Sequence, residues 1–175
     1  MATGEPIMRI GFDVSQTAEN KAGCGFVADQ LIRALVQLAP QHEYLLYPSF
    51  YGYQAQDPLQ ATCPDSPQVR LVNLKADPQF DDYDWWRRRS VDRSEKLGYP
   101  DVIHSNNFSC PLDIGAARRV MTVYDLSFLD LPEATTEANR LVCFQGMLEA
   151  SVYADHLLMI SAATRDRFLD YFPHY

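Results

Sequence analysis

Short apolar runs of the kind that form buried strands alternate with helix-patterned segments along most of this chain. The first run, residues 8–14 (MRIGFDV), is apolar on both faces and therefore predicts a buried strand, which ends at Asp13. A polar, glycine-containing loop follows over residues 15–25. In residues 26–39 apolar side chains then recur at helical spacing until Pro40. A strand, a loop and a helix in this order are typical of an α/β fold.

The same alternation continues to the end of the sequence. Residues 48–68 are rich in proline and are expected to form a long loop. The patterns predict helices at 82–97 and 136–154, and further strands at 43–47, 69–74, 101–104, 119–124 and 155–161. We therefore expect one domain over residues 1–175, with an open, mainly parallel sheet between two layers of helices. This is a three-layer, Rossmann-like α/β architecture.

Composition excludes several classes of protein. The chain has 175 residues, of which 47% are hydrophobic and 22% charged, so a disordered chain is excluded. Its net charge is −8, divided as −5 over residues 1–87 and −3 over the rest, which argues against a nucleic-acid partner. No apolar run approaches the roughly 20 residues of a transmembrane helix, and no signal peptide is recognised, so a cytoplasmic protein is expected. The four cysteines form no C-x-x-C pair, which argues against a metal site.

Polar residues follow several predicted strands at the point where each strand ends. Ligands of open α/β sheets bind beyond the carboxyl ends of the strands, so these residues are the candidates for a binding site. Polar groups gathered at one edge would suit a ligand with many hydroxyls, because each hydroxyl needs a donor or an acceptor. The candidates are Asp13, His104, Ser105, Asn106, Asn107, Tyr124, Asp125 and Ser161.

Three of these residues have a functional and a structural interpretation. His104 is a candidate base or hydrogen-bond donor, because imidazole titrates near neutrality; the alternative is a half-buried histidine bonded to a backbone carbonyl. Asp125 is a candidate acceptor for a substrate hydroxyl, or it closes an Asx turn. Ser161 is expected to cap a helix, which would also leave amides free for an anion.

Two glycines open the first predicted helix. Residues 23–28 (GCGFVA) match the dinucleotide-binding pattern G-x-G-x-x-[GA], but about nine residues separate Asp13 from Gly23, and no acid follows the second strand. We therefore reject that interpretation. Gly23 and Gly25 either let the backbone approach a phosphate or sugar oxygen at the helix N-terminus, or form a simple loop turn and helix entry.

The run of two tryptophans and three arginines at residues 85–89 predicts a helix with core-facing aromatics and a solvated basic face. Its functional alternative is attraction to anionic lipid headgroups, so peripheral membrane contact stays open.

Four segments, taken in order, resemble bacterial glycosyltransferases of family 4: residues 10–47, 100–112 (PDVIHSNNFSCPL), 118–133 (RRVMTVYDLSFLDLPE) and 154–168 (ADHLLMISAATRDRF). The resemblance implies the GT-B arrangement, in which two Rossmann-like domains face each other across a cleft. In that family the N-terminal domain binds the acceptor, and the C-terminal domain binds a nucleotide sugar through a Glu-x7-Glu motif. This chain contains no such motif and stops at Tyr175. The resemblance therefore implies an isolated acceptor half, inactive by itself.

The family further implies a retaining transferase in glycan or polysaccharide synthesis, with no metal and no cofactor. The nucleotide sugar is a substrate, bound through the missing domain, and the acceptor is a sugar or a lipid-linked glycan. In many relatives a His-Asp pair ends the strand that here ends in Tyr124 and Asp125. Tyrosine has a pKa near 10 and can donate a hydrogen bond, so the resemblance leaves catalysis to be shared by His104, Asp125 and Tyr124. Two other classes stay open: a free-standing nucleotide- or NAD-binding module and a non-catalytic interaction domain.

Overall fold

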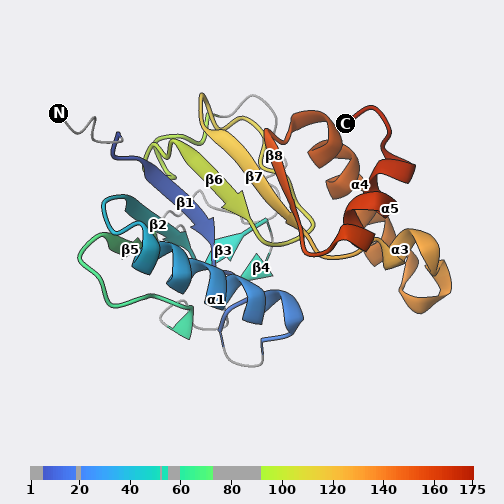
Figure 1. Cartoon of the computed structure of the whole chain (residues 1–175), viewed down its shortest axis with the longest axis horizontal. Helices are drawn as coiled ribbons and strands as arrows, with labels where there is room; N and C mark the ends of the chain where they lie inside the picture. Colours follow the sequence, from blue (N-terminus) through green and yellow to red (C-terminus); the bar gives the residue numbers. More distant parts are fainter. Residues whose placement is uncertain (1–5, 19–20, 52, 55–59, 73–91) are drawn as a thin grey trace.

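The computed structural model describes residues 6–18, 21–51, 53–54, 60–72 and 92–175, and the statements below concern those residues. Its main feature is an open sheet of six strands in the order β5-β2-β1-β6-β7-β8 (Figure 1), in which every neighbouring pair is parallel. This confirms the predicted α/β, Rossmann-like fold. The strands are β1 (Arg9–Asp13), β2 (Glu43–Tyr47), β5 (Val69–Leu71), β6 (Val102–Ser105), β7 (Arg118–Val123) and β8 (His156–Met159).

Helices flank this sheet, and two of them begin at a side-chain cap. The longer ones are α1 (Gly23–Leu38), α4 (Glu137–Tyr153) and α5 (Ala162–Tyr171), and two short ones are α3 (Ser127–Asp130) and the 3₁₀ turn η3 (Pro132–Ala134). Thr136 caps α4. Ser161 caps α5 by accepting a hydrogen bond from the Thr164 amide at 3.0 Å. The predicted helix-capping role of Ser161 is confirmed.

The long loop predicted over residues 48–68 is interrupted by two short strands. Within it, β3 (Ser49–Phe50) pairs antiparallel with β4 (Tyr53–Gln54), and Phe50 and Ala61 are buried. Each of these strands has two residues, which is too short to give a periodic pattern in the sequence.

The helix predicted at 82–97 and the aromatic–basic run within it fall mostly outside the described residues. Its last part, residues 94–98, forms turns that end at Gly98, whose φ is +81°. Residues 73–74 of the predicted third strand also fall outside.

The core lies on both faces of the sheet. Ala28 and Ile32 of α1 pack on Phe12 and Leu46, while Tyr47 and Ile103 belong to the cluster on the opposite face. A third cluster joins β7 and β8 to α4 and α5, around Met121, Met147 and Phe168. Figure 1 shows α1 lying across one face of the sheet and α4 and α5 gathered beside β8. No described helix is long and apolar enough to cross a lipid bilayer.

The order of the strands reverses between β1 and β6. From β1 the chain proceeds to β2 and β5 on one side, and later returns to β6 on the other side of β1. In open α/β sheets the connections leave such a reversal in opposite directions, which opens a crevice beyond the carboxyl ends of the two strands. The ends of β1 and β6 are therefore the place to examine for a site.

Candidate functional site

Asp13 and Asn106 join the carboxyl ends of β1 and β6. The Asp13 carboxylate accepts hydrogen bonds from the amide and hydroxyl of Ser15 at 2.9 and 2.7 Å, and from the Asn106 amide at 3.1 Å. In return the Asn106 side-chain amide donates to the Asp13 carbonyl at 3.0 Å. Both residues are about 1% exposed. These bonds fix the ends of the two strands side by side at the reversal of strand order.

His104 continues the network into β7. Its Nε2 lies 2.8 Å from the hydroxyl of Thr122, and that hydroxyl donates to Oδ1 of Asn106 at 3.1 Å. A hydroxyl has one proton to give, so Nε2 of His104 carries hydrogen and donates to Thr122. The imidazole also meets the ring of Phe12 edge-on, with centroids 4.9 Å apart.

This environment sets the protonation of His104. Burial, with a smaller effect from the nearby His156, lowers the pKa of the imidazole from 6.5 to about 4. The ring is therefore neutral at pH 7, and the geometry favours the role of hydrogen-bond donor over that of base. The predicted alternative, a bond to a backbone carbonyl, is not what is observed, because the partner of Nε2 is a threonine hydroxyl.

Thr122 is a site residue that sequence reasoning missed. It is 1% exposed in the middle of a predicted strand, and its hydroxyl connects the imidazole to the side-chain oxygen of Asn106. The available signal was a polar residue inside an apolar strand, RVMTVY, two positions before the end of that predicted strand.

Asp13 has an unusual pKa for a carboxylate. Burial raises it from 3.8 to about 6, against the opposing effect of the hydrogen bonds from Ser15 and Asn106. Perturbed carboxylates of this kind are common in functional sites, although structural networks also produce them.

Ser105 and Asn107, which flank Asn106, are buried but less well bonded. The Ser105 hydroxyl reaches the Val120 carbonyl only at 3.5 Å. The side chain of Asn107 is buried, and neither its Oδ1 nor its Nδ2 has a hydrogen-bond partner among the described residues. Buried amides are nearly always paired, so this residue calls for a physical explanation.

Tyr124 and Asp125 follow β7 at the same edge. The Tyr124 hydroxyl donates to the carbonyl of Cys24 in α1 at 3.3 Å, and burial raises its pKa well above the usual value. The exposed Asp125 carboxylate accepts from the amide and hydroxyl of Ser127 at 2.9 and 2.6 Å, which is the Asx turn given above as its structural interpretation. Thr164, next to the Ser161 cap, donates to the Tyr124 carbonyl at 3.2 Å and so places that cap beside the same strand end.

The two glycines of α1 serve different purposes. A Cβ at Gly25 would collide with the carbonyl of Gln16, whereas one at Gly23 would meet nothing within 4 Å. Gly25 therefore allows the loop after β1 to pack onto the helix, which gives a packing reason for a glycine at this position. A ligand role for Gly23 or Gly25 stays a prediction. The residue before it, Ala22, offers no side-chain cap to the first turn.

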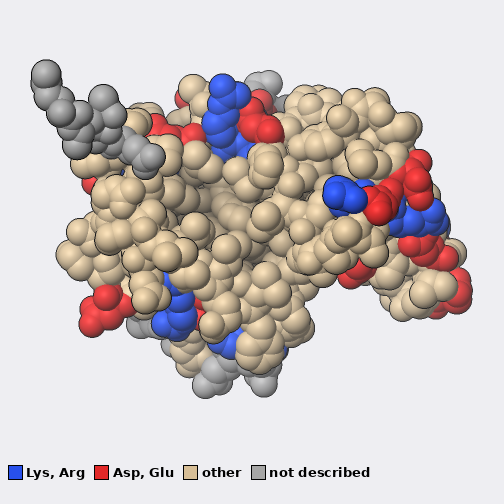
Figure 2. Space-filling model, in the orientation of Figure 1, with Lys and Arg blue, Asp and Glu red and all other residues tan. Residues whose placement is uncertain are grey.

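These residues occupy one region of the molecule. In Figure 1 the arrowheads of β1, β6 and β7 point toward the end of α1 that begins at Gly23. Figure 2 shows that the outline of the molecule is indented between this end of α1 and α3. The structure thus brings Asp13 and Asn106 into direct hydrogen-bonded contact, connects His104 to Asn106 through Thr122, and links Tyr124 to the start of α1.

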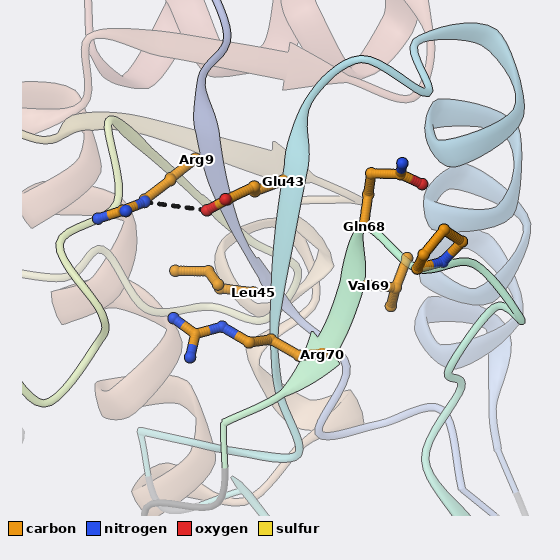
Figure 3. Close-up of a pocket in the computed structure, with 7 residues that line it drawn as sticks. Arg9, Glu43, Leu45, Gln68, Val69 and Arg70 are labelled. Carbon is orange, nitrogen blue, oxygen red and sulfur yellow. Dashed lines mark hydrogen bonds and ion pairs between the residues drawn. The ribbon is translucent and has the colours of Figure 1, made fainter.

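The cavities that we describe lie at the opposite edge of the sheet. One, of about 330 Å³, is lined by Arg9, Glu43, Leu45, Pro67, Gln68, Val69 and Arg70 at the beginnings of β1, β2 and β5. Figure 3 shows the Arg9–Glu43 ion pair above Leu45 and the guanidinium group of Arg70. The two atoms of this ion pair are 2.9 Å apart. The second, of about 400 Å³, is lined by Asp92, Asp113, Gly115 and Arg119. None of the predicted site residues lines either cavity.

In comparisons with known proteins, no protein-family model matches this chain and no curated protein matches it significantly.

Proposed function

We propose that this chain is the acceptor-binding domain of a retaining glycosyltransferase of the GT-B type. The parent enzyme would transfer a sugar from a nucleotide sugar to a sugar or lipid-linked glycan acceptor, as the sequence resemblance implies. One observation carries the proposal beyond that resemblance. Side chains from β1, β6 and β7 meet in a single hydrogen-bonded network where the strand order reverses, which is where open α/β sheets bind ligands.

The residues of this edge divide into supporting and contacting groups. Asn106 bonds to both Asp13 and Thr122 and so holds the strand ends in register, and His104 donates to Thr122. Asp125 is exposed and is the group best placed to orient an acceptor hydroxyl. Both hydrogen bonds from Ser127 use its Oδ1, and no other described residue donates to its Oδ2. A carboxylate oxygen that accepts from the acceptor hydroxyl would align it for transfer.

The donor side of the reaction lies outside this chain in our proposal. The nucleotide sugar would be held by a second domain, and no metal is required of the residues described above. The chain alone should therefore bind an acceptor without transferring sugar to it. The cytoplasm, where nucleotide sugars are made, is the proposed location.

A sugar-transfer assay with a labelled nucleotide sugar tests this proposal. Residues 1–175 alone should give no turnover, while a protein in which they are followed by a donor-binding domain should transfer. In that longer protein, His104→Ala and Asp125→Ala should each lower kcat at least tenfold. Arg70→Ala, in the cavity at the far edge of the sheet, is the control and should leave kcat unchanged.

Two results would count against the proposal. Clear turnover by residues 1–175 alone would refute the division of the site between two domains. Unchanged kcat in both site variants would remove His104 and Asp125 from the site.

A nucleotide- or NAD-binding module is the second candidate, because the same strand order occurs in dinucleotide-binding domains. The packing of Gly25 against the chain's own loop argues against it, since the fingerprint uses its second glycine to approach the pyrophosphate. Binding of NAD at micromolar affinity, measured by calorimetry, would favour this candidate.

A further inference from the structure

The unpaired carboxamide of Asn107 is the feature that the fold itself does not explain. It is 1% exposed, and neither its oxygen nor its nitrogen has a partner in the part of the chain that the structure describes. A buried polar group left unpaired lowers stability, because it has given up its hydrogen bonds to water. An apolar side chain of similar size would avoid that cost, so stability does not account for an asparagine at this position.

The adjacent Asn106 shows what a supporting asparagine looks like at the same strand end. Its amide, its side-chain nitrogen and its side-chain oxygen each make a hydrogen bond, to Asp13 or to Thr122. Moving the Asn106 side chain would break two of these bonds. Rotating the Asn107 side chain breaks no hydrogen bond within the described part of the chain, because this residue is bonded through its backbone: the Ser109 amide donates to its carbonyl at 2.7 Å.

We propose that Asn107 recognises the sugar acceptor. Its carboxamide would form hydrogen bonds with a hydrogen-bond donor and a hydrogen-bond acceptor that lie side by side on an uncharged sugar. The inference rests on the proposed function and names the chemical class of its acceptor. A carboxamide presents one accepting oxygen beside one donating nitrogen. Its complement is a group with the same two functions side by side, such as two neighbouring hydroxyls or an acetamido group.

The neighbouring carboxylate of Asp13 favours a sugar that carries no negative charge at this position. Asp13 accepts a hydrogen bond from the amide of Asn106, the residue next to Asn107, and lies in a buried environment where charges interact strongly. Above about pH 6 it is negative. A phosphate or carboxylate on the same part of the ligand would be repelled, while hydroxyl and acetamido groups would not.

Access requires a change in the side chain and little else. Because the carboxamide is covered, it meets a ligand only after its side chain rotates toward the carboxyl edge of the sheet. The carbonyl of the next residue, Phe108, lies directly against Gly146 of α4, so the backbone of this turn is held in place. Side-chain rotation on a fixed backbone is therefore the expected route.

Binding of three probes to residues 1–175 tests the inference: methyl glucoside, N-acetylglucosamine and glucose 6-phosphate, each titrated at millimolar concentration and followed by NMR. The neutral probes should bind at least tenfold more tightly than the phosphate. Comparison of the two neutral probes tells whether a pair of hydroxyls or an acetamido group is preferred. Asn107→Ala and Asn107→Leu should weaken the binding of the preferred probe at least tenfold.

Measurements of stability distinguish a role of Asn107 in ligand recognition from a structural role. Both Asn107 variants should unfold at the same urea concentration as the parent or at a higher one, while Asn106→Ala should unfold at a lower one. Loss of stability in the Asn107 variants with unchanged sugar binding would overturn the inference, as would equal binding of the phosphate probe. Failure of the proposed function is a separate result: sugar would still bind through Asn107, and the two-domain protein would transfer none.

Discussion

Two buried groups, Asp13 and His104, should make the stability of this chain depend on pH between pH 4 and 6.5, and their effects act in opposite directions. For Asp13, burial raises the pKa from 3.8 to about 6. Between those pH values the native state holds a proton that the unfolded chain has released, so the stability associated with Asp13 falls as the pH rises. A difference of about two pKa units corresponds to about 3 kcal/mol.

His104 has the opposite dependence. Its pKa is lowered from 6.5 to about 4, so between those values the unfolded chain binds a proton that the native state does not. The stability associated with His104 is therefore present above pH 6.5 and is lost as the pH falls toward 4, again by about 3 kcal/mol. In the parent chain the two contributions nearly cancel.

Single substitutions should expose each contribution. Asp13→Asn leaves the histidine, so this variant should lose about 3 kcal/mol relative to the parent as the pH falls from 6.5 to 4. His104→Gln keeps a donor for Thr122 and leaves the carboxylate, so it should lose a similar amount as the pH rises from 4 to 6.

Urea unfolding followed by circular dichroism at 222 nm measures both effects. With a typical slope of about 2 kcal/mol per molar urea, the expected relative shift in midpoint is about 1.5 M, with opposite signs for the two variants. The double variant is the control, and its difference from the parent should be independent of pH. Single variants whose difference from the parent also stays constant across this range would refute the reasoning.

Three further substitutions test the packing of the site and its surroundings by the same unfolding measurement. Thr122→Val leaves two buried partners without a hydrogen bond and should lower the stability by about 2–5 kcal/mol; a loss below about 1 kcal/mol would contradict the network. Gly25→Ala should destabilise by at least about 2 kcal/mol, because its methyl group would meet a loop carbonyl, whereas the matched Gly23→Ala enters open space; similar losses in both would show that close packing is not the reason for the first. Ser161→Ala should lower stability by about 1 kcal/mol through the lost helix cap, and an unchanged midpoint would rule out that role.

Much of the fold could be predicted from the sequence because the signals that define it are local. Buried strands such as residues 43–47 show as apolar runs, and a long helix shows its period of 3.6. The end of β1 at Asp13 and the cap at Ser161 were likewise readable, since a strand end and a helix start depend on neighbouring residues. The two-residue strand β3 could not be found in this way, because a pattern needs more residues than it contains.

The residues of the candidate site could be predicted from the sequence, but their arrangement in space could not. Sequence placed Asp13 and Asn106 at strand ends, and the strand order alone put those ends beside each other. The hydrogen bond between the two residues joins positions 93 apart in the chain, and no local pattern encodes such a pairing.

The same reason applies to the residues whose meaning changed. Thr122 became part of the site because β6 and β7 are neighbours, and Gly25 proved to be a packing residue because a loop carbonyl lies against it. The sequence by itself determined the elements and the chemistry available at their ends. Only the tertiary structure decided which of those groups are paired and which, like the carboxamide of Asn107, are unpaired among the described residues, because pairing depends on distances between segments that are remote in the chain.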